Sequence, residues 1–183
     1  ASGVLVARAD GVAGRLDGTV VLSFPGVDFG GDFAITVNSG AAPVQRSVDL
    51  GSSTLVLDVP AGPYLRVEAR NVTITILGQT LTGDVRIERV TGPGGTTVTT
   101  IGLANVDLRM GAGANGVRIT GGSGLLVVTA GGVAGRLTGT VAVTLPAGVS
   151  LSGSLSLIVN TTTSPVHTSL DVGRSAVALS VPG

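Results

Sequence analysis

The chain has 183 residues, with 11 basic and 11 acidic side chains and a formal net charge of +0. All the basic residues are arginine, which excludes Schiff-base and P-loop lysine chemistry and the Lys–Asn isopeptide cross-links of some surface fibres. No basic run indicates a nucleic-acid partner, and no apolar run reaches the ~20 residues that span a bilayer.

The composition favours a β-sheet core built from aliphatic side chains. Hydrophobic residues make up 43% of the chain, whereas aromatic residues make up 2% and tryptophan is absent. Layers of Val, Leu and Ile suit sheet packing better than a pocket for a bulky ligand. The 30 glycines are interpreted as breaks between strands. The absence of cysteine does not indicate the cellular compartment.

Alternation of apolar and polar residues predicts β-strands along the whole chain, and helical spacing is sustained nowhere. In the clearest strand, Leu81, Val85 and Ile87 share one face and polar residues take the other. Gly- and Pro-containing turns separate such strands at short intervals, which predicts antiparallel pairing between sequence neighbours. We expect about eight strands per repeat in an up-and-down meander. In chain order, the strands with this alternation lie at residues 16–22, 29–35, 81–87, 137–143 and 151–157.

Two asparagines mark positions where the alternation shifts by one residue. Odd-numbered residues from Leu65 to Ala69 are apolar, and after Asn71 the apolar face moves to even-numbered residues from Val72. The same shift occurs at Asn105. Because asparagine tolerates a left-handed backbone, each shift indicates a β-bulge or a sharp bend. The alternative is that one strand ends there and another begins.

Polar residues on one face of each strand and aliphatic residues on the other predict sheets with one wet face. Two such sheets should face each other across an aliphatic core, as a sandwich, a flattened solenoid or a taco-like fold. We therefore expect an all-β fold of antiparallel meander repeats, which form an elongated solenoid-like rod or a two-sheet sandwich rod.

A tandem repeat organises the chain. Residues 11–20 return as residues 132–141 with one change in ten, which gives a period of 121 residues (132 − 11). One inserted residue, Ala147, then moves the offset to 122, so that Asn38 aligns with Asn160.

These offsets predict three parts in the chain. Residues 1–10 end a preceding unit, residues 11–131 form one complete unit, and residues 132–183 begin the next. Each unit leaves unpaired strand edges, on which the next unit should stack end to end.

Three segments resemble the long repeats of giant bacterial surface proteins. They are Gly-Val-Ala-Gly-Arg-Leu-Thr-Gly-Thr-Val at residues 132–141 and the segments at 60–68 and 78–84. They are similar to LEPR-XLL-type proteins and related very large adhesin-like chains. The resemblance implies secretion and an extracellular structural or adhesive role, and it carries no catalytic residue. A nested Leu-x-Gly-x-Val-x-Leu theme is also similar to periplasmic lipid-conduit proteins with taco-shaped sheets.

Candidate metal-ligating and acid–base residues are few. His167 is the only histidine, and its counterpart in the other copy is Gln45, so we interpret it as a surface polar residue. Asp28 and Asp32 offer carboxylates to Ca²⁺, but no Asp-x-Asp-x-Asp-Gly loop surrounds them. A solvated turn is the favoured interpretation.

Charged residues have a structural and a functional interpretation. Glu68 and Glu88 could form the carboxylate pair of a glycosidase, but a chain with one tyrosine and no tryptophan lacks a sugar-stacking cleft. The charges that recur in both copies are interpreted as structural or solvated: Arg15 with Arg136, and Asp49 with Asp171. Mixed-sign residues on one outer face should fix the strand register: Glu68, Arg70, Asp84, Arg86 and Glu88. Sequons at Asn71 and Asn160 are interpreted as coincidence.

We therefore predict no catalytic, cofactor-binding or metal-binding residue and no enzymatic activity. The predicted function is a structural or adhesive β-rich repeat of a very large extracellular or cell-surface bacterial protein, which forms a rod or fibre by end-to-end sheet continuation. Its expected partners are neighbouring copies of the repeat, and a surface or glycan. The alternative is a binding module or conduit whose sheet groove holds a glycan or a lipid. An open apolar groove would favour the conduit, and a filled core would favour the rod.

Overall fold

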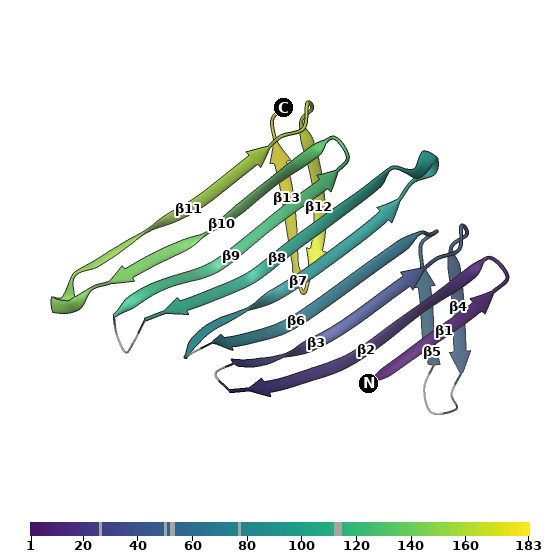
Figure 1. Ribbon diagram of the computed structural model, residues 1–183, viewed down its shortest axis with the longest axis horizontal. Coiled ribbons are helices and arrows are strands. Elements are labelled where there is room, and N and C mark those ends of the chain that lie inside the picture. The colour runs from purple at the N-terminus through teal and green to yellow at the C-terminus, as the bar shows by residue number, and fades with distance from the viewer. Residues whose placement is uncertain (26, 50, 52–53, 77, 112–114) are drawn as a thin grey trace.

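The chain is almost entirely β-strand in the computed structural model, which describes all residues except 26, 50, 52–53, 77 and 112–114. The prediction of an all-β, antiparallel fold is confirmed. Nine strands lie side by side in one large antiparallel sheet, in the order β1-β2-β3-β6-β7-β8-β9-β10-β11 (Figure 1). They are β1 (Ser2–Arg8), β2 (Gly11–Phe24), β3 (Val27–Asn38), β6 (Tyr64–Ile76), β7 (Gln79–Thr91), β8 (Thr97–Met110), β9 (Gly116–Thr129), β10 (Gly132–Thr144) and β11 (Ser150–Asn160).

The large sheet is interrupted in sequence by a hairpin. After β3 the chain leaves the sheet, forms β4 (Val44–Asp49) and β5 (Thr54–Val59), and returns in β6, so β3 pairs with β6. A second hairpin, β12 (Val166–Val172) and β13 (Ser175–Val181), follows β11. In Figure 1 both hairpins run across the direction of the sheet strands. The meander predicted from short turns is therefore present, with one excursion per copy.

Each hairpin packs on the large sheet and encloses a small aliphatic core. The first buries Leu57 and Val59 against Ala13 of β2, and the second buries Leu179 against Leu125 of β9. Both cores lie on the same face of the sheet. We call it the hairpin face, and we call the opposite face the open face.

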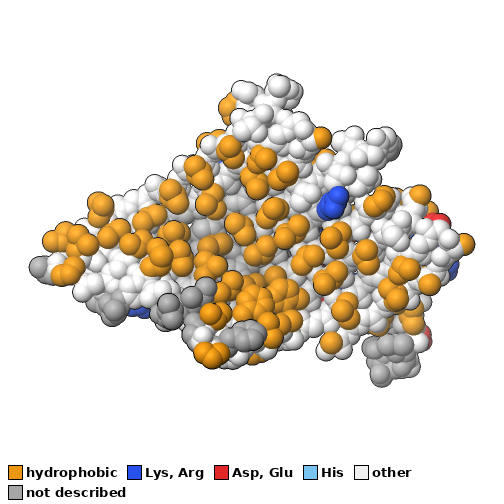
Figure 2. Space-filling model, in the orientation of Figure 1, with side chains coloured by type: hydrophobic (Ala, Val, Ile, Leu, Met, Phe, Trp, Pro, Cys, Tyr) orange, Lys and Arg blue, Asp and Glu red, His pale blue; other side chains and the backbone are white. Residues whose placement is uncertain are grey.

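The open face is aliphatic. Because side chains alternate between faces along a strand, directly paired residues of neighbouring strands share a face. One register-aligned row crosses six strands on the open face: Leu16, Ile35, Val67, Ile87, Ile101 and Leu126. Figure 2 shows hydrophobic side chains spread over this face.

The sequence predicted that a second sheet would cover these aliphatic residues, and the structure differs in this detail. Within the described part of the chain, the hairpins pack on the other face and no element covers the open one. The reason is that β1, β2, β9 and β10 carry apolar residues on both faces at the ends that lie beside the hairpins. Val6 and Ala13 therefore hold the first hairpin, and Val127 and Ala134 hold the second.

Both asparagines at the phase shifts lie in β-bulges, as predicted. Asn71 has φ 52° and Asn105 has φ 55°, and each lies inside a continuous strand beside a shift in pairing register. The carboxylate of Asp84, on the intervening β7, accepts hydrogen bonds from the Asn71 N–H at 2.9 Å and from Asn105 Nδ2 at 2.8 Å. One aspartate thus holds two neighbouring bulges.

The two copies of the repeat use the same strand register. Leu5 of β1 faces Gly14 of β2, and Leu126 of β9 faces Gly135 of β10, each 121 residues after its counterpart (126 − 5; 135 − 14). The two hairpins also share one register. Since β9 pairs directly with β10, one uninterrupted sheet runs from the first copy into the second.

Candidate functional site

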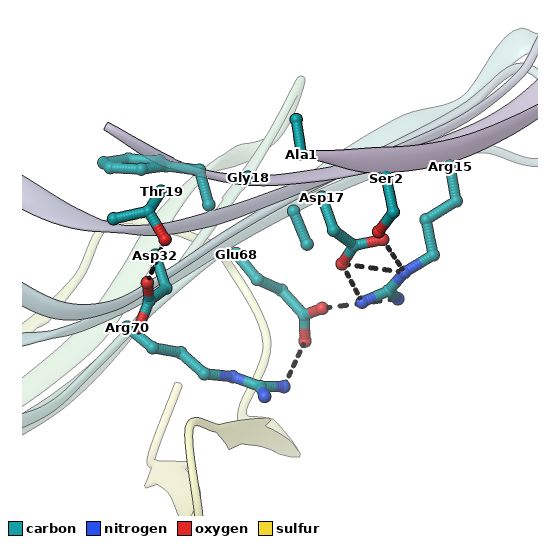
Figure 3. A pocket seen from close by; sticks show the side chains of 11 residues that line it. Ala1, Ser2, Arg15, Asp17, Gly18, Thr19, Asp32, Glu68 and Arg70 are labelled. Carbon is teal, nitrogen blue, oxygen red and sulfur yellow. Dashed lines mark hydrogen bonds and ion pairs between the residues drawn. The ribbon is translucent and has the colours of Figure 1, made fainter. Parts of the chain in front are cut away.

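Charged side chains gather on the hairpin face around β6. This strand lies between the strands that the first hairpin covers and those that the second hairpin covers. A hollow of about 380 Å³ opens there. We call it the polar hollow, and Figure 3 shows its side chains. Its charged and hydroxyl-bearing lining residues are Ser2, Arg15, Asp17, Thr19, Asp32, Glu68 and Arg70.

Glu68 is the centre of this cluster because four arginines surround its carboxylate. Guanidinium nitrogens of Arg15, Arg66, Arg70 and Arg86 each lie 3.8 Å from a Glu68 carboxylate oxygen. Only 9% of the glutamate is exposed. A buried carboxylate is costly unless cations compensate it. The arginines of β2, β6 and β7 therefore permit its burial.

Two of these arginines hold another carboxylate at shorter range. Arg15 donates through Nη2 to Asp17 Oδ1 at 2.7 Å and through Nε to Asp17 Oδ2 at 2.9 Å. These hydrogen bonds raise the pKa of Arg15. Burial disfavours the charged form of Arg86, but its hydrogen bond to Glu88 and the negative charges of Glu88 and Glu68 together outweigh burial and raise the pKa of Arg86. Such two-residue spacing along one strand places acid and base on the same face.

Asp32, at the other end of the polar hollow, is held by neutral donors. Thr19 Oγ1 donates to Asp32 Oδ1 at 2.8 Å, and Asn71 Nδ2 donates to Asp32 Oδ2 at 3.3 Å. Both hydrogen bonds lower the pKa of Asp32, because they favour its charged form. The aspartate thereby connects β3 to both of its neighbours in the sheet.

This arrangement suits a fixed charge network better than proton transfer. A general acid or base needs a pKa near the working pH, whereas the pKa values of Asp32, Arg15 and Arg86 move away from neutrality. Among the described residues, no three His, Asp or Glu side chains gather as metal ligands do. The polar hollow can hold strands in register and can make electrostatic contact with a polar ligand.

His167 lies exposed on the second hairpin and belongs to a cross-strand pair. Its Nδ1 is 3.0 Å from Ser180 Oγ. The counterpart Gln45 donates to Asp58 at 3.2 Å across the first hairpin. The position therefore carries a polar cross-strand pair in both copies, which agrees with its interpretation as a surface residue.

The candidate carboxylate pairs do not form joint sites. Glu68 and Glu88 lie on neighbouring strands of the hairpin face, but Arg86 binds both. Both carboxylates are thus ion-pair partners of one arginine, which is a structural arrangement. Asp28 and Asp32 lie within strand β3, so the interpretation of this segment as a solvated turn is wrong, and they accept hydrogen bonds from different hydroxyl groups.

The charges that recur in both copies have different partners. Arg15 binds Asp17, whereas the counterpart of Asp17 after Arg136 is a threonine. The carboxylate of Asp49 accepts a backbone N–H, whereas Asp171 contributes its backbone carbonyl to Arg86 Nη1 at 3.0 Å. These positions therefore serve local packing in each copy.

Sequence reasoning missed the role of Asn38, although its alignment with Asn160 was a signal. Asn38 is fully buried. Its Nδ2 donates to the carbonyls of Ala42 at 2.9 Å and Pro60 at 2.7 Å, and its Oδ1 accepts from the Gly40 N–H at 2.9 Å. One side chain thus fastens both ends of the first hairpin to β3.

The second copy repeats this arrangement. Asn160 Nδ2 donates to the carbonyls of Ser164 and Pro182, and its Oδ1 accepts from the Thr162 N–H at 2.9 Å. We call each of these two sets of hydrogen bonds an asparagine latch.

With this geometry in hand, the chain was compared with known proteins. No family model, curated protein or solved structure matches it. Within the described residues, no helix has the length and hydropathy required to cross a membrane. The function must therefore follow from the residues and their geometry.

Proposed function

We propose that this chain is a structural β-repeat whose copies continue one sheet edge to edge, with a mechanical or adhesive role on the outside of a bacterial cell. The observation that carries this proposal is the pairing of β9 with β10. Strands from two successive copies are hydrogen-bonded neighbours, in the register that β1 and β2 use. The boundary between copies therefore resembles any other strand pair in the sheet.

The spacing between copies supports a lengthwise structure. The sheet order places β9 six strands after its counterpart β1. At ~4.8 Å per strand, each copy advances the sheet by about 29 Å. Each copy also adds one hairpin to the hairpin face, and an asparagine latch fastens it. A rod, fibre or sheath follows when many copies are joined.

The Glu68 cluster supports a mechanical role because it ties strands together across the sheet. Its charged groups come from β2, β6 and β7. Register is weakly specified in sheets rich in glycine. Oppositely charged residues on neighbouring strands favour one register over slipped alternatives.

The open aliphatic face favours a second candidate, a conduit that holds acyl chains. An open sheet, however, contacts an acyl chain on one side only and leaves its other side in water. Within the described residues no element rises from the open face to form a wall, because both hairpins pack on the other face. The structural role is therefore the better supported one.

The edge-to-edge proposal can be tested by measuring length against copy number. Chains lengthened by one, two and three whole 121-residue units would be compared by small-angle X-ray scattering. The maximum dimension should grow by about 29 Å per unit while the cross-section stays constant. Independent globules joined by mobile linkers, with no fixed increment, would contradict the proposal.

A further inference from the structure

Two apolar hollows on the open face are the same feature repeated. The first is lined by Gly3, Leu5, Gly14, Leu16, Ile35 and Val37. The second is lined by Gly124, Leu126, Gly135, Leu137, Leu157 and Val159. Each of these six residues of the second hollow lies 121 or 122 positions after its counterpart in the first. The hollows are thus six strands, or about 29 Å, apart.

Each hollow arises because leucines lie over glycines of the neighbouring strand. A Cβ on Gly14 would lie 2.8 Å from Leu5 Cδ1, and a Cβ on Gly135 would lie 2.6 Å from Leu126 Cδ1. Any side chain at either glycine would displace the leucine. Leucine ridges therefore occupy the space over these glycines, and an apolar hollow beside them occurs twice in the same register.

The open face is large enough to form a stable interface. Nine strands of mostly 11 to 14 residues cover about 40 Å by 40 Å, or about 1,600 Å². Stable protein interfaces need about 800 Å² from each partner. Among the described residues of this face, Arg89 is the sole charged side chain. Leu5, Leu151 and Leu157 are 71%, 72% and 60% exposed.

We propose that the open face packs against the open face of a second copy of this chain. The two sheets would lie about 10 Å apart, as in β-sandwiches, and leucine ridges of one copy would enter the apolar hollows of the other. Such an interface joins the same patch on both copies, and a two-fold axis relates them.

The repeat spacing identifies the partner as a second copy. Hollows about 29 Å apart match the ridges of another copy, which carry the same spacing, whereas a lipid has no such period. A second sheet also covers the aliphatic residues of the whole face, which an acyl chain on a flat surface does not. The net charge of +0 means that two copies do not repel each other.

This inference goes beyond the proposed function, because it concerns the face of the sheet and not its edges. Face pairing would supply the second layer of an aliphatic core. Edge continuation would determine the length. Either one can fail without the other.

Sedimentation equilibrium of the 183-residue chain tests the inference. The wild-type chain should show twice its monomer mass of 17.9 kDa. Leu157→Glu, at a 60% exposed position of the open face, should weaken association about 100-fold, because a carboxylate would enter the apolar interface. The matched control is Ile158→Glu, which is 52% exposed on the opposite face of the same strand and should associate like the wild type.

A second pair of variants guards against loss of folding. Leu16→Glu changes the first hollow at a 58% exposed position, and Val21→Glu changes a 77% exposed position of the same strand on the other face. Circular dichroism should show unchanged strand content in all four variants. Leu16→Glu alone of this pair should weaken association.

Three results would overturn the inference. One is a wild-type chain that stays monomeric at high concentration. Another is association of Leu157→Glu and Leu16→Glu that equals that of their controls. The third is flotation of the wild-type chain, but not of Leu157→Glu, with phosphatidylcholine vesicles, which would identify lipid as the occupant. None of these results would change the expected increment of about 29 Å per unit, so failure of this inference is distinguishable from failure of the proposed function.

Discussion

Glu68 and Asn38 are buried polar side chains of the hairpin face, and their surroundings satisfy them in different ways. Glu68 has four cations at 3.8 Å, and a change in one of them leaves three. Asn38 has three hydrogen bonds of 2.7–2.9 Å to backbone groups, and no other described side chain takes part in them. The first arrangement is shared among strands, whereas the second depends on one residue.

Replacement of Glu68 by glutamine should lower the free energy of unfolding by about 3 kcal/mol. The change leaves four guanidinium groups around a neutral side chain, and removal of one partner from a buried ion cluster is costly. Arg70→Gln is the matched control, because the Arg70 side chain is 53% exposed and its loss should cost less than about 1 kcal/mol. Urea unfolding measures both. Equal losses would show that Glu68 is not the centre of the cluster.

Asn38→Ala should cost about 2 kcal/mol of unfolding free energy, because the carbonyls of Ala42 and Pro60 lose the donor that the buried Asn38 side chain supplies. Asn38→Asp should not restore stability, since a carboxylate cannot donate to a carbonyl. Asn160→Ala should cost less because Asn160 is only half-buried. Urea unfolding with amide exchange of the β4–β5 hairpin measures these effects. An Asn38→Asp variant as stable as the wild type would exclude the latch.

At the scale of elements, bulges bend the sheet and hairpins cover it. Local sequence predicted the bulges, because a phase shift with asparagine at the joint has few structural explanations. It did not predict the hairpins. Strands β4 and β5 alternate like the sheet strands, and alternation identifies a strand without naming its partner. Apolar residues on both faces of β1 and β2, at Val6 and Ala13 for example, were the available signal.

Backbone conformation at Asn105 yields a prediction about these bulges. Asn105→Val should lower the free energy of unfolding by about 2 kcal/mol, because a β-branched residue is strained at φ 55° and the bond to Asp84 is lost. Asn105→Gly loses the same bond but adopts this backbone without strain, so it should be the milder change. Thermal and urea unfolding distinguish the two. Equal destabilisation would show that the hydrogen bond alone matters.

At the scale of the whole molecule, features that follow from the sequence pattern differ from features that depend on contacts between distant residues. The sequence predicted the aliphatic and polar faces and the repeat, because these depend on alternation and self-similarity alone. It predicted mixed charges at Glu68 and Arg86, but not the four arginines around one glutamate. Arg15 is 53 residues away in the chain (68 − 15), and only the pairing of β2, β3 and β6 brings it near. The open face likewise depends on where the hairpins pack.

The shared register at the β9–β10 boundary also has a genetic consequence. A DNA segment that encodes 121 residues can be duplicated or deleted in frame, and every strand in the shortened or lengthened product still meets the neighbour it had before. Unequal crossing-over between the copies would then change the molecular length in steps of about 29 Å and leave the strand pairing unchanged. Alleles of such a gene would encode molecules that differ in length but carry the same kinds of side chain on their surfaces.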